Sequence, residues 1–174
     1  MELSAAIALV EKGISKNNQP QAWADLGAGD GFFTHAISHL LPPGSSVFAV
    51  DQNKQALKQI EVADGVNLTR IPGDFVVDEF PFGSLDGVIM ANSLHYAKEQ
   101  MLMLTKVKAT LKPLGRMIII EYEMATANSW VPYPVPFERL KAMVKILDLS
   151  CALIGETQSA FANRKIYAAL LSNN

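Results

Sequence analysis

Three glycines at alternate positions follow a short apolar run near the start of the chain. The run covers residues 22–26 and contains Asp25. Gly27, Gly29 and Gly31 come directly after it. Glycine lets the backbone turn sharply and approach a ligand closely, because no Cβ intervenes. The segment from Asp25 to Gly31 is therefore expected to be a ligand-binding loop that could serve a nucleotide.

The spacing of these glycines excludes two common nucleotide loops. A P-loop requires Gly-Lys-Ser/Thr after its glycines, and Phe32-Phe-Thr34 stands at that point. The dinucleotide fingerprint requires glycine at its first, third and sixth positions, and the sixth position counted from Gly27 is Phe32. Glycine at the fifth position, with an acid two residues before the first glycine, fits neither pattern.

The loop must be positioned by a sheet, because continuous apolar runs alternate with helical patterns along the chain. Helices are expected near residues 3–14, 33–40, 54–61, 101–111 and 137–149, and strands near 22–26, 47–51, 66–71, 85–90, 116–121, 151–160 and 165–171. This order implies a parallel sheet covered on both faces. Pro113 and Gly115 are expected to end the fourth helix, and the short connection 162–164 predicts an antiparallel hairpin. The glycine loop then lies at the carboxyl ends of the strands, where such sheets bind ligands.

The chain resembles the class I S-adenosylmethionine-dependent methyltransferases, whose loop reads acid-x-Gly-x-Gly-x-Gly. Asp51 ends the second expected strand, where that family places an acid on the ribose hydroxyls. Asp74 and Phe75 resemble its third motif, whose acid contacts the adenine amino group while the next residue packs on the ring. Residues 85–89 and 111–121 resemble its fourth strand and fifth motif. Taken singly, Asp51 could instead cap the helix after it, and Asp74 could be a turn residue.

The resemblance implies a Rossmann-like, doubly wound α/β fold with a mostly parallel seven-stranded sheet, a C-terminal antiparallel hairpin and helices on both faces. It implies a single domain over residues 1–174, with residues 1–16 as a helix over the cofactor site. The expected cofactor is S-adenosylmethionine, and S-adenosylhomocysteine is the product. The residues expected to bind the cofactor are Asp25, Gly27, Ala28, Gly29, Gly31, Asp51, Gln52, Asp74, Phe75 and Asn92.

The stretch from Asn92 to Tyr96 follows the fourth strand and is the expected acceptor side. His95 can serve as a base near neutral pH, or it is an ordinary loop histidine bonded to backbone. Tyr96 and Glu121 are the other catalytic candidates; Glu121 can bind the acceptor, orient a neighbouring group or cap the next helix. Asn92 is not followed by the two prolines common in methyltransferases of nucleic-acid and peptide amino groups. A small organic acceptor is therefore expected.

Aromatic side chains beside prolines could wall the acceptor pocket or pack in the core. They are Trp130, Tyr133 and Phe137. His35 and His39 stand four apart on a helix, but no third ligand is nearby, so no metal site is expected.

Composition restricts the remaining possibilities. The chain has 174 residues, a formal charge of −2 and one cysteine, Cys151. A single cysteine allows no intramolecular disulfide, and no apolar run is long enough to span a membrane. We therefore expect a soluble, cytoplasmic protein that is a monomer or a homodimer. Nucleic acid is an unfavoured partner at this charge, although Arg139, Lys141 and Lys145 cluster. Two other functions stay open: a nucleic-acid or protein methyltransferase acting with a partner, and a catalytically silent protein that binds the cofactor.

Overall fold

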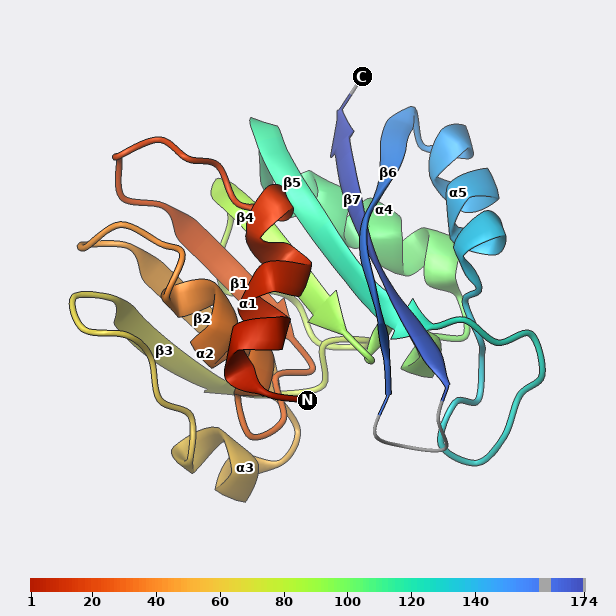
Figure 1. Ribbon diagram of the computed structural model, residues 1–174, viewed down its shortest axis with the longest axis horizontal. Helices are drawn as coiled ribbons and strands as arrows, with labels where there is room; N and C mark the ends of the chain where they lie inside the picture. Colours follow the sequence, from red (N-terminus) through yellow and green to blue (C-terminus); the bar gives the residue numbers. More distant parts are fainter. Residues whose placement is uncertain (160–163, 174) are drawn as a thin grey trace.

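The computed structural model describes residues 1–159 and 164–173 (Figure 1). Its helices are α1 (Leu3–Val10), α2 (Phe32–Ser38), α3 (Lys54–Lys58), α4 (Gln100–Thr110) and α5 (Phe137–Ile146), with short 3₁₀ helices η1 (Glu11–Gly13) and η2 (Leu94–Tyr96). Its strands are β1 (Ala22–Leu26), β2 (Ser46–Asp51), β3 (Asn67–Pro72), β4 (Leu85–Ala91), β5 (Leu111–Tyr122), β6 (Leu149–Gln158) and β7 (Lys165–Asn173). Among the described helices, none has the length and apolar character that crossing a membrane requires.

The strands form one seven-stranded sheet in the order β3-β2-β1-β4-β5-β7-β6. The first five strands in this order pair in parallel, and β7 pairs antiparallel with both β5 and β6. This arrangement confirms the predicted fold, including the hairpin of the last two strands. Of the predicted connection at 162–164, residues 162 and 163 lie outside the described residues. The chain runs outward from β1 to β3 and returns to β4, so the direction of winding reverses between β1 and β4.

Helices cover both faces of the sheet, as Figure 1 shows with α1 in front of it and α4 behind. Successive side chains of a strand point to opposite faces. On β4, Val88 and Met90 pack with residues of α4 and α5, whereas Ile89 packs with residues of α1 and α2. Trp23 lies fully buried on the second face, opposite Gly87 in the register. A Cβ on Gly87 would lie 2.3 Å from the indole ring, so this packing requires glycine.

Several expected boundaries differ from the structure, and those of the first and the fourth helix have an evident physical reason. The first helix ends at Val10 and continues only as the η1 turn, and Gly13 passes so close to β5 that an added Cβ would lie 2.5 Å from Ile118. The expectation that Pro113 and Gly115 end the fourth helix is wrong: α4 stops at Thr110, and both residues lie within β5. Proline is tolerated there because the pairing with β4 shifts register between Leu85 and Gly87, which leaves the segment 112–115 outside the ladder.

Candidate functional site

The glycine loop lies where the winding of the sheet reverses, at the carboxyl ends of β1 and β4. Gly27 and Ala28 both donate a backbone hydrogen bond to Val50 O, at 2.9 and 3.0 Å. Ser93, just after β4, donates its hydroxyl to Leu26 O at 2.6 Å. The start of the loop is thus fixed to both neighbouring strands. The crevice at such a reversal is the usual ligand site of open α/β sheets.

Gly27, Gly29 and Gly31 all adopt positive φ, with values of 80°, 57° and 87°. The surroundings of the three glycines differ. A Cβ on Gly27 would meet Ser93 at 2.6 Å, and one on Gly31 would meet Ile60 at 2.5 Å. One on Gly29 would meet nothing within 4 Å, so the loop borders open space at this residue.

Asp51 joins the end of β2 to the glycine loop. Its Oδ2 accepts a hydrogen bond from Gly29 N at 2.8 Å, and its Oδ1 accepts one from Asn53 N at 2.7 Å. A carboxylate has acceptor capacity for further hydrogen bonds beyond these two. The helix cap is a different residue, because Asn53 Oδ1 accepts from Gln55 N and Ala56 N at the start of α3. The alternative of Asp51 as the N-cap is therefore wrong.

Asp25 is a fully buried carboxyl beneath the same loop. Thr34 donates its hydroxyl to Asp25 Oδ2 at 2.6 Å, and Oδ1 is buried with no partner among the described residues. Burial raises the pKa of Asp25 from 3.8 to about 7, the Thr34 hydrogen bond opposes this rise, and the nearby charge of Asp51 adds to it. Asp25 thus lies buried under the loop, and its carboxyl group is largely protonated at mildly acidic pH.

Asp74 is a turn residue, which was the alternative to cofactor binding considered for it, and it also lines a cavity. Its Oδ1 accepts from Val76 N at 2.9 Å, and its backbone N donates to Asp78 Oδ2 at 2.7 Å. Phe75 is buried and lies beneath Gly27, 3.1 Å from where a Cβ would stand. The two interpretations of Asp74 are compatible, because the turn leaves one carboxylate oxygen free of these contacts.

These residues surround a cavity of about 520 Å³, named here the cofactor cavity. Its lining residues are Gly27, Asp51, Gln52, Asp74, Phe75, Val76, Asn92, Ser93 and Tyr96. A smaller adjoining cavity of about 260 Å³ lies along the glycine loop and is lined by Asp25, Gly27, Ala28, Gly29, Asp30, Phe32, Phe33, Ala91 and Asn92. Of the ten residues predicted to bind the cofactor, all but Gly31 line one of the two cavities. The sequence analysis missed Ser93, although it lies within the stretch singled out after β4.

His95 and Glu121 form a buried pair on the acceptor side. His95 Nδ1 lies 2.7 Å from Glu121 Oε2, and His95 N donates to Glu121 Oε1 at 3.0 Å. The side chains are 2% and 1% exposed. Of the three roles considered for Glu121, the structure shows that of orienting a neighbouring group, the His95 imidazole. Helix capping belongs to Glu123, whose Oε2 accepts from Phe137 N at 3.2 Å at the start of α5.

A second cavity of about 360 Å³, named here the acceptor cavity, adjoins the first. Its lining residues are Asn92, His95, Tyr96, Tyr122, Met124, Asn128, Trp130, Val131 and Arg164. Asn92 and Tyr96 line both cavities, so they form the boundary between them. Asn92 adopts a φ of 53°, and its buried Oδ1 has no partner among the described residues. Met124 and Arg164 carried no signal in the sequence, because their segments meet the site only in the fold.

The aromatic residues after β5 divide between the two roles considered for them. Trp130 is 71% exposed and lines the acceptor cavity. Phe137 packs on the buried Tyr167, with ring centroids 5.5 Å apart, so its role is in the core. Tyr133 lines neither cavity and donates its backbone N–H to His95 O at 3.1 Å. Tyr96 is half-exposed, and burial, followed by the charge of Glu121, raises its pKa, which keeps its hydroxyl protonated at neutral pH.

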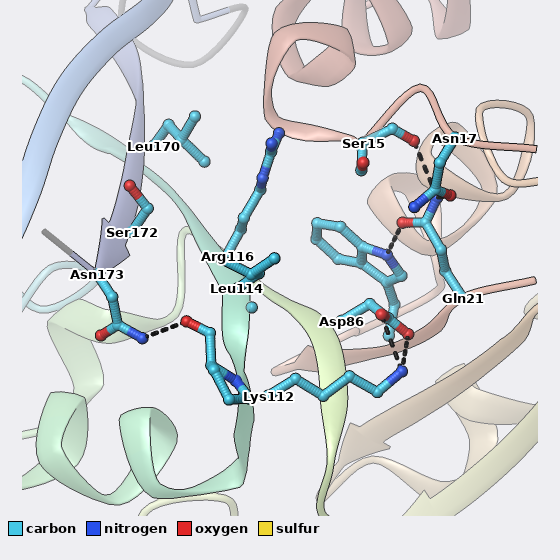
Figure 2. Close-up of a pocket in the computed structure, with 13 residues that line it drawn as sticks. Ser15, Asn17, Gln21, Asp86, Lys112, Leu114, Arg116, Leu170, Ser172 and Asn173 are labelled. Atoms are coloured by element: carbon cyan, nitrogen blue, oxygen red, sulfur yellow. Dashed lines mark hydrogen bonds and ion pairs between the residues drawn. The ribbon is translucent and has the colours of Figure 1, made fainter. Parts of the chain in front are cut away.

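A further cavity, of about 760 Å³, lies at the opposite edge of the sheet (Figure 2). It opens beside the amino ends of β1 and β4, where the Lys112 ammonium lies 2.8 Å from the Asp86 carboxylate. Asp86 also accepts from Ala22 N at 2.8 Å, and Asn173 donates to Pro113 O at 2.7 Å. These contacts join β1 to β4, β4 to β5 and β5 to β7, and none of the predicted site residues lines this cavity.

Three other predictions concern residues outside the two cavities. His35 and His39 lie with their Nε2 atoms 3.2 Å apart, and the described residues contain no group of three potential metal ligands. The α1 helix packs against α2 and β6, and only Met1, ahead of it, lines a small cavity together with Asn92. Two of the clustered cations make contacts within the chain, Arg139 with Pro134 O and Lys141 with Glu138.

Comparison with known proteins identifies the family. Residues 24–117, more than half of the chain, match the family model of a methyltransferase domain. The chain belongs to this methyltransferase family. The match runs from β1 into β5 and includes the glycine loop and the strand ends around the cofactor cavity. Among curated proteins, none matches the sequence.

Solved structures share the fold, and two of the following three are named as methyltransferases. The YcgJ protein of Bacillus subtilis superposes with a TM-score of 0.74 at 13% identity, over 98% of this chain and 99% of that one. The magnesium protoporphyrin IX methyltransferase ChlM of Synechocystis PCC 6803, solved with bound SAM, gives 0.68 at 19% identity, over 97% and 77%. The plantazolicin methyltransferase BpumL, solved with SAH, gives 0.70 at 13%, over 99% and 83%. The resemblance to the class I methyltransferases is thus confirmed at the level of family and fold.

Proposed function

We propose that this chain transfers a methyl group from S-adenosylmethionine to a small organic acceptor. One observation carries the proposal: the cofactor cavity and the acceptor cavity meet at Asn92 and Tyr96. Family membership supplies the reaction class, and two adjoining cavities supply the two places that a bimolecular transfer needs. Holding both reactants in contact is the main task of such an enzyme, because the sulfonium is already a good leaving group.

The residues of the first cavity suit the donor. Gly29 borders open space, so the backbone can approach a ligand there. Asp51 retains acceptor capacity for ribose hydroxyls, and Asp74 retains it for an adenine amino group. Asn92 presents a buried amide oxygen that has no donor among the residues that the structure describes. When bound, S-adenosylmethionine would supply an electrophilic methyl group on a sulfonium.

The residues of the second cavity suit a small acceptor. ChlM and BpumL, which share the fold, are named for magnesium protoporphyrin IX and for plantazolicin, so this fold serves more than one acceptor. In this chain the cavity measures about 360 Å³, which is near the lower end of typical ligand pockets. We assign His95, held by Glu121, as the group that faces the acceptor, and Tyr96 as a wall shared with the donor.

Removal of the Asp51 carboxylate tests the donor site. Isothermal titration of the wild type should detect binding of both S-adenosylmethionine and S-adenosylhomocysteine. Asp51→Ala should weaken both by about 10- to 100-fold, because one partner of buried hydrogen bonds is lost, at a cost of about 1–3 kcal/mol. Asp64→Ala, which removes an exposed carboxylate beyond α3, is the matched control and should bind as the wild type does.

Two results would contradict the donor assignment. An unchanged affinity in a folded Asp51→Ala protein, checked by circular dichroism, would reject the role of Asp51. If the wild type binds neither compound, the proposed function itself fails.

A further inference from the structure

Building on the proposed function, we propose that the acceptor is an aromatic compound with a hydroxyl group, methylated on oxygen, and that His95 removes the hydroxyl proton. Three observations within the acceptor cavity carry this inference: a buried imidazole nitrogen without a partner, a carboxylate that fixes the state of that imidazole, and walls made largely of aromatic and apolar side chains.

The His95–Glu121 contact determines which nitrogen of the imidazole carries hydrogen. An ionised carboxylate only accepts hydrogen bonds, so the hydrogen of a neutral imidazole must lie on Nδ1, 2.7 Å from Glu121 Oε2. Nε2 is then a bare acceptor. It is buried, lines the acceptor cavity as part of His95, and has no hydrogen-bond partner among the described residues. A buried acceptor of this kind requires a donor, and an O–H group of the ligand would supply one.

The strength of this base selects among acceptor groups. A phenolic hydroxyl has a pKa of about 10 and is largely protonated at neutral pH, so it gains most from a histidine base. An aliphatic hydroxyl resembles water, whose pKa lies too far above that of imidazole for efficient proton transfer. An aryl amine is already nucleophilic without losing a proton. An aryl thiol is more acidic than an alkyl thiol, whose pKa is about 8.5, so it ionises near neutral pH without a base, and it is a weak donor to Nε2.

The walls of the cavity fit a flat ring. Tyr96, Tyr122 and Trp130 line it together with the apolar side chains of Met124 and Val131. The Tyr96 and Tyr122 rings lie 4.4 and 6.3 Å from the His95 ring, centroid to centroid. Aromatic rings pack favourably against one another at such distances. A one- or two-ring compound would therefore lie among these side chains with its hydroxyl at His95.

The transfer balances with these groups alone. The acceptor oxygen forms a bond to the methyl carbon, the carbon–sulfur bond of the donor breaks with its electron pair going to sulfur, and the hydroxyl proton goes to His95 Nε2. The positive charge of the sulfonium thus ends on the imidazole. There it lies beside the Glu121 carboxylate, which stabilises it in the buried site.

Acceptors that share the naphthalene ring system and differ in the reacting group test which atom is methylated and whether an aromatic ring binds. Transfer from methyl-labelled S-adenosylmethionine to β-naphthol, β-naphthylamine and thio-β-naphthol is measured with the wild type, and binding of β-naphthol and of β-naphthyl methyl ether is measured by isothermal titration. We expect β-naphthol to be methylated at least ten times faster than the other two. It should also bind at least ten times more tightly than the ether, which has no proton to donate.

Glu121→Gln tests the role of the pair without changing its size. The glutamine amide would donate to Nδ1, so the hydrogen of a neutral His95 would move to Nε2, and Nε2 could no longer accept the proton. We expect the rate with β-naphthol to fall about 10²- to 10⁴-fold, the binding preference over the ether to disappear, and the affinity for S-adenosylmethionine to stay. The ¹⁵N shifts of His95 should show the change of tautomer. The control is Glu123→Gln, which removes a carboxylate two residues away that contacts Phe137 N and should leave the rate unchanged.

The outcomes separate the two proposals. The inference is overturned if the amine or the thiol is methylated faster than β-naphthol, or if β-naphthol and its ether bind equally or not at all. It is also overturned if the rate is unchanged in Glu121→Gln. A wild type that binds S-adenosylmethionine but gives any of these results keeps the proposed function and loses only the acceptor class. A wild type that does not bind S-adenosylmethionine loses the proposed function.

Discussion

The free energy of unfolding is expected to fall as the pH rises from about 4 to about 8, and the carboxyl group of Asp25 is the main cause. Burial raises the pKa of Asp25 from 3.8 to about 7 in the folded protein. Between these values the carboxyl is protonated when folded and ionised when unfolded, so unfolding releases a proton and stability declines with pH. Since one pKa unit corresponds to about 1.4 kcal/mol, the contribution lost by pH 8 approaches about 4 kcal/mol.

Asp25→Asn isolates this contribution from those of other groups. The amide oxygen can still accept from the Thr34 hydroxyl, but the side chain no longer titrates. Urea denaturation at several pH values should show the stability of the variant relative to the wild type rising by up to about 4 kcal/mol from pH 4 to pH 8. Asp30→Asn, an exposed position in the same loop, is the control and should follow the wild-type curve. A constant difference between Asp25→Asn and wild type across this range would show that Asp25 is ionised in the folded protein.

Alanine at Gly27 and alanine at Gly29 are expected to damage different properties of the protein. At Gly27 a Cβ would overlap Ser93 and crowd Phe75, at a backbone φ of 80°. Overpacking and the left-handed backbone each cost about 1–3 kcal/mol, so we expect Gly27→Ala to lower the free energy of unfolding by about 3 kcal/mol. At Gly29 the Cβ meets no atom within 4 Å, and only the backbone cost of about 1 kcal/mol remains.

Binding of S-adenosylmethionine should be affected mainly in Gly29→Ala, the variant whose stability changes less. The space in front of Gly29 is where we place the donor, so Gly29→Ala should lose affinity for S-adenosylmethionine by at least about tenfold, 1.4 kcal/mol, while staying folded. Chemical denaturation and isothermal titration on the same two variants check both halves of the prediction. Wild-type affinity in Gly29→Ala would place the donor elsewhere, and a stable Gly27→Ala would contradict the tight packing of the loop against Ser93.

The parallel part of the fold was predictable because its signals are local. Apolar runs, glycines and the acids at strand ends indicate where β1 to β4 end, and parallel strands bring those ends to one edge. Asp25 and Asp51 were found at such strand ends, whereas Asp74 and the roles of all three acids were implied by the resemblance to the class I methyltransferases. Their individual contacts were not, since the capping of α3 falls to Asn53 rather than Asp51.

The acceptor side was less predictable because it depends on contacts between distant segments. His95 and Glu121 were both candidates, but they lie 26 positions apart in the sequence and nothing in it indicates that they touch. The difference between Trp130, which lines the cavity, and Phe137, which packs on Tyr167, follows from how the loop before α5 lies on the sheet. Pattern alone also could not show that the start of β5 bulges away from β4 and so accommodates Pro113.

The position of β7 bears on how the protein is made. The strand follows all the others along the chain, yet it pairs on both sides, with β5 and with β6 (Figure 1). Until it leaves the ribosome, β6 has no neighbour in the sheet, and β5 presents an open edge that includes Ile118, Ile119 and Ile120. An open apolar edge is prone to pairing with other chains. The nascent protein therefore presents this apolar edge until residues 165–173 emerge and pair with it.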